Sequence, residues 1–530
     1  MGASLLAALV ASVLLAAVAR RFDVSAPLAL VVAGLAGSAI PGFGGVHLEP
    51  ELVLFVILPP LLWSAGLESS YVALRRNIRP IGLLAVGLPL ATTFVVGLVA
   101  FHTVPELTIA AALTLGAIVA PPDAVSATAV GRRLGLPRRT MTLLGGESLL
   151  NDATALTAYK VALAAAIGTA STWGSGFGTF ALAAVGGVVV GAVIGMIVHY
   201  IRSRLDDPLV ESAVGLVAPF FIYLLAEEVH GSGVIAVVVA ALLLGQREAQ
   251  ASYATRLQDK AVWKALQLVL ESFAFLLIGL QLPEVVQELT GISAATLASS
   301  SAAVLIAVIG VRIIWVYAFV YLPWLMSKRL RAREPAPARG QVFILAWAGM
   351  RGVVSLAAAF AVPATTLSGE PFPGRPQLVF LTFVVVVGTL LLHGLTLPWF
   401  IRVLDAQGNE AHSDAIATAA AQDKAARAAA ERLDQLLAEQ PADADVPDRA
   451  AEVLRAWNTR RRNAAWERLG RDDADIGESP TAAFRRMRLE MLAAERETFI
   501  AERDAGHIDD EVLRTVLHGL DLEEATLNRD

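Results

Sequence analysis

The sequence predicts an all-α polytopic membrane protein that ends in a helical cytoplasmic tail. Apolar residues make up 56% of the 530 residues, charged residues make up 17%, and the apolar residues occur in long runs. One soluble core cannot bury that much apolar surface, whereas about 20 apolar residues in a helix span the hydrocarbon of a bilayer. The runs stop near Arg402, so we expect a membrane domain at 1–402 and a separate tail at 403–530.

About thirteen apolar stretches are expected to cross the membrane. The first is expected to be a retained span and not a signal peptide, because no basic segment precedes it and its charges follow the apolar run. The predicted spans lie near residues 4–19, 26–41, 51–67, 80–102, 107–130, 140–168, 177–201, 208–229, 231–245, 262–283, 296–325, 340–364 and 377–401.

The distribution of basic residues predicts how these spans are oriented. Six alternate loops hold 20 Lys and Arg residues, and the six loops on the opposite side hold only Arg375. Because short basic loops stay in the cytoplasm, we expect the N-terminus outside the cell and the tail inside. The expected location is the inner, cytoplasmic membrane.

The tail has a different composition from the membrane domain. Residues 403–530 hold 17 Lys and Arg against 28 Asp and Glu, a net charge of −11, which argues against a nucleic-acid partner. Apolar residues recur at helical spacing in 413–438 and 480–504, and PADADVPD at 441–448 marks a break. These patterns favour a small helical regulatory or assembly domain, with a loosely ordered solubilising tail as the alternative.

Two of the predicted spans contain residues that interrupt a helix. Thirteen spans can hold two six-helix units of opposite orientation around one linking helix, and the fifth helix of each unit is then span five and span twelve. Span five carries Pro121-Pro122, and span twelve carries Gly349 and Gly352. Proline removes a backbone donor and glycine weakens a helix, so both spans are expected to be broken. Interrupted helices at corresponding positions of inverted repeats indicate the ion site of a transporter.

Carboxylates lie close to the first of these interruptions. An ionisable group at the membrane centre costs roughly 2.5–3.5 kcal/mol, so each one is a functional candidate. Asp123 follows the two prolines, and Ser148 and Asp152 share one helix face because they are four residues apart. With a backbone carbonyl near Pro122, these side chains can supply the hard oxygen ligands that Na⁺ needs. The alternatives are structural hydrogen bonds for the aspartates and a bond from Ser148 to its own helix.

Three basic groups also lie within predicted spans. Arg351 is at the break of span twelve, where an unpaired guanidinium would be costly, and Glu147 is its expected partner. Glu271 and Arg312 are expected to form a mutual structural pair, with a role in cation conduction as the alternative. Lys160 lies two turns beyond the aspartate of span six and is expected to be outside the site.

Five motifs, in this order, resemble one family of membrane proteins. They are LPPLLWSAGLESS, APPDAVS, GESLLNDATAL, GSGVIAVVVAALLLG and GMRGVVSLAAAF, and the resemblance extends over residues 1–402. The family is the sodium/proton exchanger (monovalent cation:proton antiporter 1) family, particularly its bacterial branch with a cytoplasmic tail. The resemblance implies the sodium/proton antiporter fold and a homodimer. It also implies a moving core that includes 80–168 and 296–401, and a dimerisation part that includes 1–67 and 177–283.

The same resemblance implies roles for individual residues. Asp152 corresponds to the essential carboxylate that cation and proton share, and Asn151 to the neighbour that steadies the unwound segment. Glu147 and Arg351 correspond to a structural ion pair. Electroneutral exchange of one cation for one proton is implied, and Asn151 fits this because electrogenic relatives carry a second aspartate there.

The sequence departs from the family pattern at the first break. Pro122 stands where relatives often have threonine, whose backbone carbonyl helps to bind the ion, and Ala124 replaces the usual proline after Asp123. Proline keeps the carbonyl but loses the hydroxyl. The departure bears on ion affinity and on the preference between Na⁺ and K⁺.

The predicted function is exchange of Na⁺, or of Li⁺ or K⁺, for protons by alternating access, which serves pH and sodium homeostasis. Cation and proton compete for Asp152, and mutual exclusion at one carboxylate couples their movements. The alternatives are a K⁺/H⁺ antiporter of the same family and a cation channel. An intramembrane aspartyl protease would carry YD and GxGD motifs, which are lacking, and the tail has no motif of a sensor output domain. Having no cysteine excludes disulfides, thiolate metal sites and cysteine nucleophiles, and no cofactor is expected.

Overall fold

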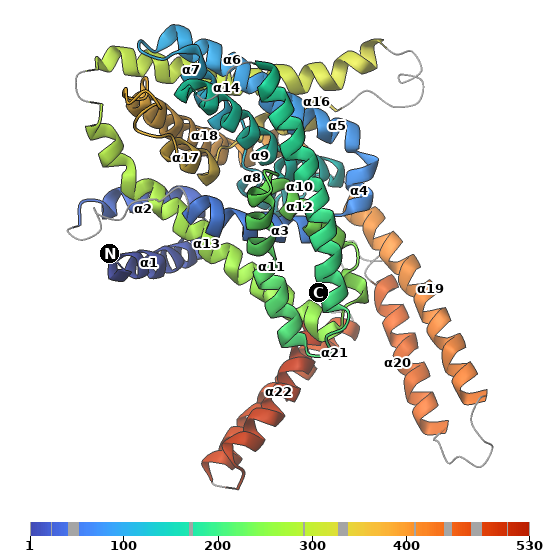
Figure 1. The fold of residues 1–530 in the computed structure, drawn as a ribbon. Helices are drawn as coiled ribbons and strands as arrows, with labels where there is room; N and C mark the ends of the chain where they lie inside the picture. The colour runs from blue at the N-terminus through green and yellow to red at the C-terminus, as the bar shows by residue number, and fades with distance from the viewer. Residues whose placement is uncertain are drawn as a thin grey trace. The chain divides into compact units, whose positions relative to one another are not determined.

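The computed structural model describes residues 2–22, 24–40, 52–168, 173–289, 292–326, 338–406, 410–438, 448–467, 480–505 and 507–528. Over these residues the chain is helical and has no β-sheet, apart from one isolated bridge between Thr365 and Pro371. The chain divides into two compact units, Met1–Gly408 and Asn409–Asp530. Figure 1 shows the helices of both units.

The first unit is a bundle of helices of very different lengths. Two π-helical turns, Leu52–Ile57 and Leu83–Gly87, run into α3 and α6 respectively. The helices are α1 (Gly2–Arg21), α2 (Ala26–Gly37), α3 (Leu58–Glu68), α4 (Tyr71–Arg76), α5 (Ile78–Gly82), α6 (Leu88–Thr103), α7 (Ile109–Ile118), α8 (Ala124–Arg133), α9 (Arg138–Ile167), α10 (Trp173–Arg202), α11 (Pro208–Glu228), α12 (Gly233–Gly245), α13 (Tyr253–Gln287), α14 (Ala294–Met326), α16 (Arg339–Trp347), α17 (Val353–Phe360) and α18 (Arg375–Val403).

Side-chain caps set where several of these helices begin. The hydroxyls of Thr108, Ser232 and Ser252 each accept a hydrogen bond from the backbone amide three residues later, at the starts of α7, α12 and α13. Such caps satisfy a backbone donor that has no partner within the helix. At its other end α9 stops at Gly168, whose φ of 91° only glycine adopts readily.

Length and composition mark many of these helices as membrane helices. Within the described residues, seven helical stretches are long and apolar enough to cross a membrane: Ser4–Arg21, Ile78–Thr103, Ala181–Arg202, Pro208–Glu228, Tyr253–Gln287, Ala294–Met326 and Arg375–Val403. Four shorter apolar helices occupy other predicted spans: Ala26–Gly37, Val53–Glu68, Ile109–Ile118 and Gly233–Gly245. The chain is therefore an all-helical, multi-pass membrane protein.

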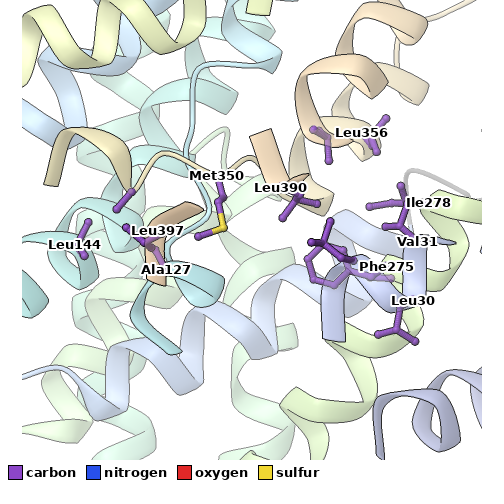
Figure 2. Close-up of a cluster of buried hydrophobic side chains, with 14 of the residues drawn as sticks. Leu30, Val31, Ala127, Leu144, Phe275, Ile278, Met350, Leu356, Leu390 and Leu397 are labelled. Carbon is purple, nitrogen blue, oxygen red and sulfur yellow. The ribbon is translucent and has the colours of Figure 1, made fainter. Parts of the chain in front are cut away.

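Close helix crossings hold the bundle together. Where α2 meets α13, a Cβ added to Gly34 would collide with the backbone oxygen of Leu276, and one added to Gly279 would collide with that of Val31. The two backbones therefore touch directly, as small residues allow between membrane helices. Around this crossing Leu30, Val31, Phe275 and Ile278 form one buried cluster that continues to Met350, Leu356, Leu390 and Leu397 (Figure 2). The α2/α13 crossing is thus packed against the part of the chain around the second break.

Both predicted helix breaks are present. The first lies between the end of α7 at Ile118 and the start of α8 at Ala124, and it contains the two prolines. The second lies between the end of α16 at Trp347 and the start of α17 at Val353, and it contains the two glycines. Predicted spans five and twelve are therefore each a pair of half-helices, α7 with α8 and α16 with α17. The backbone ends at each break lie inside the bundle.

The tail consists of two helical hairpins within its described residues. α19 (Glu410–Ala438) packs on α20 (Asp448–Glu467), and α21 (Pro480–Asp504) packs on α22 (Asp510–Leu527). Ion pairs join the helices of each hairpin, with Arg455 2.8 Å from Asp434 and Arg496 2.6 Å from Asp521. The segments predicted to be helical are helical, while 441–447 of the predicted break lies outside the described residues.

Candidate functional site

The two helix breaks cross each other inside the first unit. The backbone amide of Asp123 in the first break donates a hydrogen bond to the carbonyl of Met350 in the second, at 2.7 Å. A Cβ on Gly352 would lie 2.8 Å from the Cβ and 2.9 Å from Oδ2 of Asp123, closer than real Cβ atoms approach. The lack of a side chain at Gly352 therefore lets Asp123 lie directly against the second break.

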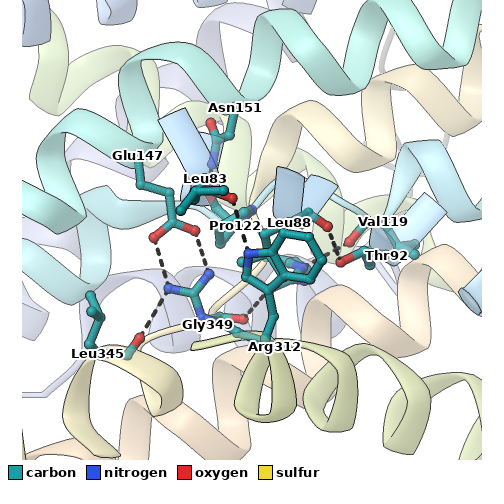
Figure 3. A network of polar contacts seen from close by, with 12 residues as sticks. Leu83, Leu88, Thr92, Val119, Pro122, Glu147, Asn151, Arg312, Leu345 and Gly349 are labelled. Carbon is teal, nitrogen blue, oxygen red and sulfur yellow. Dashed lines mark hydrogen bonds and ion pairs between the residues drawn. The ribbon is translucent and has the colours of Figure 1, made fainter. Parts of the chain in front are cut away.

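Asn151 connects α9 to the first break. Its amide nitrogen donates a hydrogen bond to the carbonyl of Pro122 at 2.9 Å, and the side chain is completely buried (Figure 3). Pro122 lies between the end of α7 and the start of α8, so its backbone oxygen would otherwise lack a helical partner. The contact joins α9 to the first break. Pro122 is not among the residues that line the cavity next to it.

A cavity of about 90 Å³ lies beside the crossing. Asp123, Ser148 and Asp152, three of the predicted ligand residues, all line it. Apolar residues of α3, α9, α13 and α17 and Pro121 also line it, together with Glu271, Gly352 and Ser355. About 10–15 Å³ of such space holds one water molecule, so the cavity has room for a small monovalent cation.

Arg312 forms the buried ion pair of this region. Its Nη1 lies 2.5 Å from Oε1 of Glu147, and its Nη2 lies 3.0 Å from Oε2 and 3.1 Å from the carbonyl of Leu345 (Figure 3). Only 1% of either residue is exposed. The expected pairs of Glu147 with Arg351 and of Glu271 with Arg312 are therefore wrong: α14 carries Arg312 against the face of α9 that bears Glu147, whereas Glu271 faces the cavity.

Arg351 is stabilised by backbone carbonyls. Its Nε donates to the carbonyl of Val119 at 2.8 Å, and its Nη1 donates to that of Gly349 at 2.6 Å. Val119 follows the last residue of α7 and Gly349 follows α16, where carbonyls lack helical partners and the helix dipole is negative. Two half-helix ends thus compensate the buried guanidinium in place of the expected carboxylate.

The remaining ionisable residues of the region separate into two groups. Lys160 forms an ion pair with Glu227 at 2.7 Å and is largely exposed, so it lies outside the site as expected. Glu271 accepts a hydrogen bond from Gln267 of its own helix at 2.7 Å and lines the cavity. Sequence reasoning singled out Glu271 but assigned it to the wrong partner. It did not consider Ser355, although this serine belongs to the GMRGVVSLAAAF motif.

A second, larger cavity of about 650 Å³ lies farther along the same helices. On α3 it is lined by Ser64, Leu67 and Glu68, while Leu58, Leu61, Leu62 and Ala65 of the same helix line the small cavity. On α13 it is lined by Trp263 and Lys264, seven residues or about 10 Å along the helix from Glu271. Several of its other lining residues belong to the basic connections, among them Arg132, Arg202, Arg247 and Lys260.

The crossed half-helices and the small cavity with the carboxylates that line it define a secondary transporter of the class that moves ions through a multi-pass helical bundle. The sequence model of the family described as "Sodium/hydrogen exchanger, transmembrane" matches residues 5–403. The chain belongs to this family of monovalent cation:proton antiporters.

Relatives and a solved structure agree with this family. An uncharacterised Na⁺/H⁺ exchanger of Mycobacterium tuberculosis is 34% identical and covers 99% of this chain and 96% of its own length. A sodium, potassium, lithium and rubidium/H⁺ antiporter of Bacillus pumilus is 32% identical over 72% of this chain and 58% of its own. The sodium proton antiporter MjNhaP1 of Methanocaldococcus jannaschii has the same fold, with a TM-score of 0.60, 20% identity and coverage of 76% of this chain and 97% of its own.

Proposed function

We propose that this protein exchanges Na⁺ for protons and that the two ions compete for Asp152. The observation that carries the proposal is the single small cavity shared by Asp123, Ser148 and Asp152 beside the crossed helix breaks. Carboxylate and hydroxyl oxygens are the ligands that hard cations prefer. Asp123 and Ser148 serve as further cation ligands in this proposal, and Asn151 steadies the break through the carbonyl of Pro122.

Competition at Asp152 provides the coupling. A carboxylate holds a proton or coordinates a cation, and either occupant cancels its charge before the site crosses the low-dielectric interior. With Asn151 beside it, the site has one fewer titrating group than a site with two adjacent aspartates. We therefore propose electroneutral exchange of one cation for one proton, in the service of pH and sodium homeostasis.

Within the family, there is a second candidate for the cation that this protein transports. The Bacillus pumilus relative is named as an antiporter of sodium, potassium, lithium and rubidium, which supports a broad selectivity. Pro122 replaces the threonine that is frequent in the family, so the ligand set at the break differs. Exchange of K⁺ or Li⁺ is the second candidate, and a cation channel would instead move cations without moving protons.

We also propose the arrangement of this protein in the cytoplasmic membrane: thirteen spans, two inverted six-helix repeats, an outside N-terminus, a cytoplasmic tail at 403–530 that regulates transport, and a homodimer. The larger cavity supports this orientation because basic connections line it, and these are expected on the cytoplasmic side. Its position along α3 and α13 from the ion site fits an inward-facing conformation.

The direct test uses proteoliposomes with an imposed pH gradient and a fluorescent reporter of internal pH. Addition of Na⁺ should dissipate the gradient, and the rate should not change when the membrane potential is clamped at different values. Asp152→Asn should abolish exchange while the protein stays folded. Retained exchange in this variant, or cation flux without proton flux in the unmodified protein, would contradict the proposal.

A further inference from the structure

Glu271 provides a carboxylate on the wall of the ion cavity that faces the helix breaks. Asp123 and the α9 residues Ser148 and Asp152 line this cavity together with residues of α3 and α13. The α3 residues that line it are apolar, so Glu271 is the ionisable group that the α3/α13 wall contributes. Among the described residues no basic side chain forms an ion pair with Glu271, whose recorded hydrogen bond comes from Gln267.

Ser355 contributes a hydroxyl from a third direction. It lies in the first turn of α17, directly after the second break, and lines the same cavity. Only 2% of the residue is exposed, and its Oγ has no hydrogen-bond partner in the described part of the chain. A buried hydroxyl without a partner costs about 1–3 kcal/mol. A cation in the cavity would satisfy it.

We propose that Glu271 and Ser355 are further cation ligands and that they complete the site formed by Asp123, Ser148 and Asp152. This inference rests on the proposed function. It adds that the wall formed by α3 and α13, which the sequence assigns to the dimerisation part, binds the ion together with the moving core. The ion is then held between the two parts that alternating access moves against each other.

The charged groups around the cavity determine how this arrangement affects cation binding. The charge of Asp123 acts on both Asp152 and Glu271, so these carboxylates repel Asp123 when they are ionised, and a cation in the cavity relieves the repulsion. The charges that reach Glu271 are those of Asp123, across the cavity, and of Arg20, at the end of α1, which packs on α13. Glu271 therefore raises the affinity of the cavity for the cation.

Exchange kinetics of Glu271 variants test the first half of the proposal. Glu271→Gln keeps the shape and an acceptor for Gln267 but removes the charge, so the apparent KM for Na⁺ should rise about tenfold, with a smaller change in maximal rate. Glu271→Asp should recover part of the affinity. The matched control is Glu284→Gln, on the same helix but away from the cavity, and it should have the KM of the unmodified protein.

The second half is tested by a single cysteine, because the natural chain has none. In Ser355→Cys, a small thiol-reactive methanethiosulfonate reagent should label the cavity, and Na⁺ should slow the labelling several-fold. Ser300→Cys is the control, because Ser300 donates to the carbonyl of Thr103 and lines a different cavity from the one that Ser355 lines. Adding Asp152→Asn to Ser355→Cys should remove the protection.

The outcomes separate this inference from the proposed function. If the unmodified protein exchanges Na⁺ for protons and Asp152→Asn does not, the proposed function stands. In that case, two results together would overturn the inference alone. The first is an unchanged KM in Glu271→Gln, and the second is an equal rate of labelling of Ser355→Cys with and without Na⁺. Equal loss of maximal rate for Na⁺, Li⁺ and K⁺ with no change in any KM would also overturn it, because that pattern indicates a purely structural role for Glu271.

Discussion

The backbone of Asp123 is hydrogen-bonded to the carbonyl of Met350 at 2.7 Å, so the two interrupted helices are joined at their breaks. Each break leaves backbone groups without helical partners, and here one break satisfies part of the other. Arg351 adds to this arrangement by donating to Val119 and Gly349, one carbonyl from each break. The carboxylate of Asp123 is consequently positioned by both half-helix pairs.

Gly352→Ala should impair ion binding through Asp123. The added methyl group would lie 2.8 Å from the Cβ of Asp123, so either that side chain or the break must shift. We expect exchange to fall at least tenfold, with a weaker apparent affinity for Na⁺, measured in proteoliposomes. The control is Gly310→Ala in α14, where an added Cβ meets nothing within 4 Å. Unchanged affinity in Gly352→Ala would show that this contact does not position Asp123.

Removing Arg312 should destabilise the protein. Arg312→Ala leaves the carboxylate of Glu147 buried without its partner, which costs about 3–5 kcal/mol. We expect a lower unfolding temperature in detergent, whereas replacing both residues with apolar side chains of similar size should restore much of the loss. A double-mutant cycle over the two positions measures the interaction. Additive effects of the two single substitutions would contradict the ion pair.

The hairpin of α21 and α22 should weaken in acid because of Glu523. Both nitrogens of a bidentate contact from Arg488 lie within 2.8 Å of its carboxylate, and these hydrogen bonds lower the pKa of Glu523 below its ordinary value. A carboxylate with a lowered pKa stabilises the fold above the unfolded pKa of about 4.3, and this contribution is lost as the pH falls through the folded pKa.

Amide hydrogen exchange of the full-length protein measures this effect. Peptides from α21 and α22 should lose protection on acidification in the unmodified protein. Glu523→Gln should be less protected near neutral pH and should change less with pH. Glu490→Gln, an exposed position on α21, is the comparison. Identical pH profiles for Glu523→Gln and the unmodified protein would rule out a contribution from this pair.

Truncation should separate transport from regulation. The first 408 residues form a compact unit of their own, and all the residues that line the ion cavity belong to it. A protein that lacks 409–530 should therefore fold and exchange Na⁺ for protons, with an altered pH response as the expected difference. A well-folded but inactive truncated protein would show that the tail takes part in transport itself.

Much of the architecture followed from local chemistry. Pro121 and Pro122 cannot continue a helix, and Gly349 and Gly352 weaken one, so both breaks were predicted and both are observed. The spacing of four residues between Ser148 and Asp152 predicted that they share one helix face, and both line the small cavity. These inferences needed only the period of a helix and the backbone properties of single residues.

Other features depended on how helices rotate against one another. Arg312 and Arg351 both lie in predicted spans, but the sequence offered only Arg351 as the partner of Glu147 and paired Arg312 with Glu271. The choice between them depends on which face of α14 meets α9 and on where the second break directs its arginine. No pattern of side chains in the sequence indicates that the partners of Arg351 are backbone carbonyls.

The sequence by itself determined that the chain is a helical membrane protein, where two helices break, and which carboxylates lie near the first break, because hydropathy and backbone chemistry act over a few residues. Only the tertiary structure decided that the breaks cross, that Glu147 pairs with Arg312, and that Glu271 and Ser355 face the same cavity as Asp152. These relationships join residues more than 100 positions apart, and they depend on packing angles that no local pattern encodes.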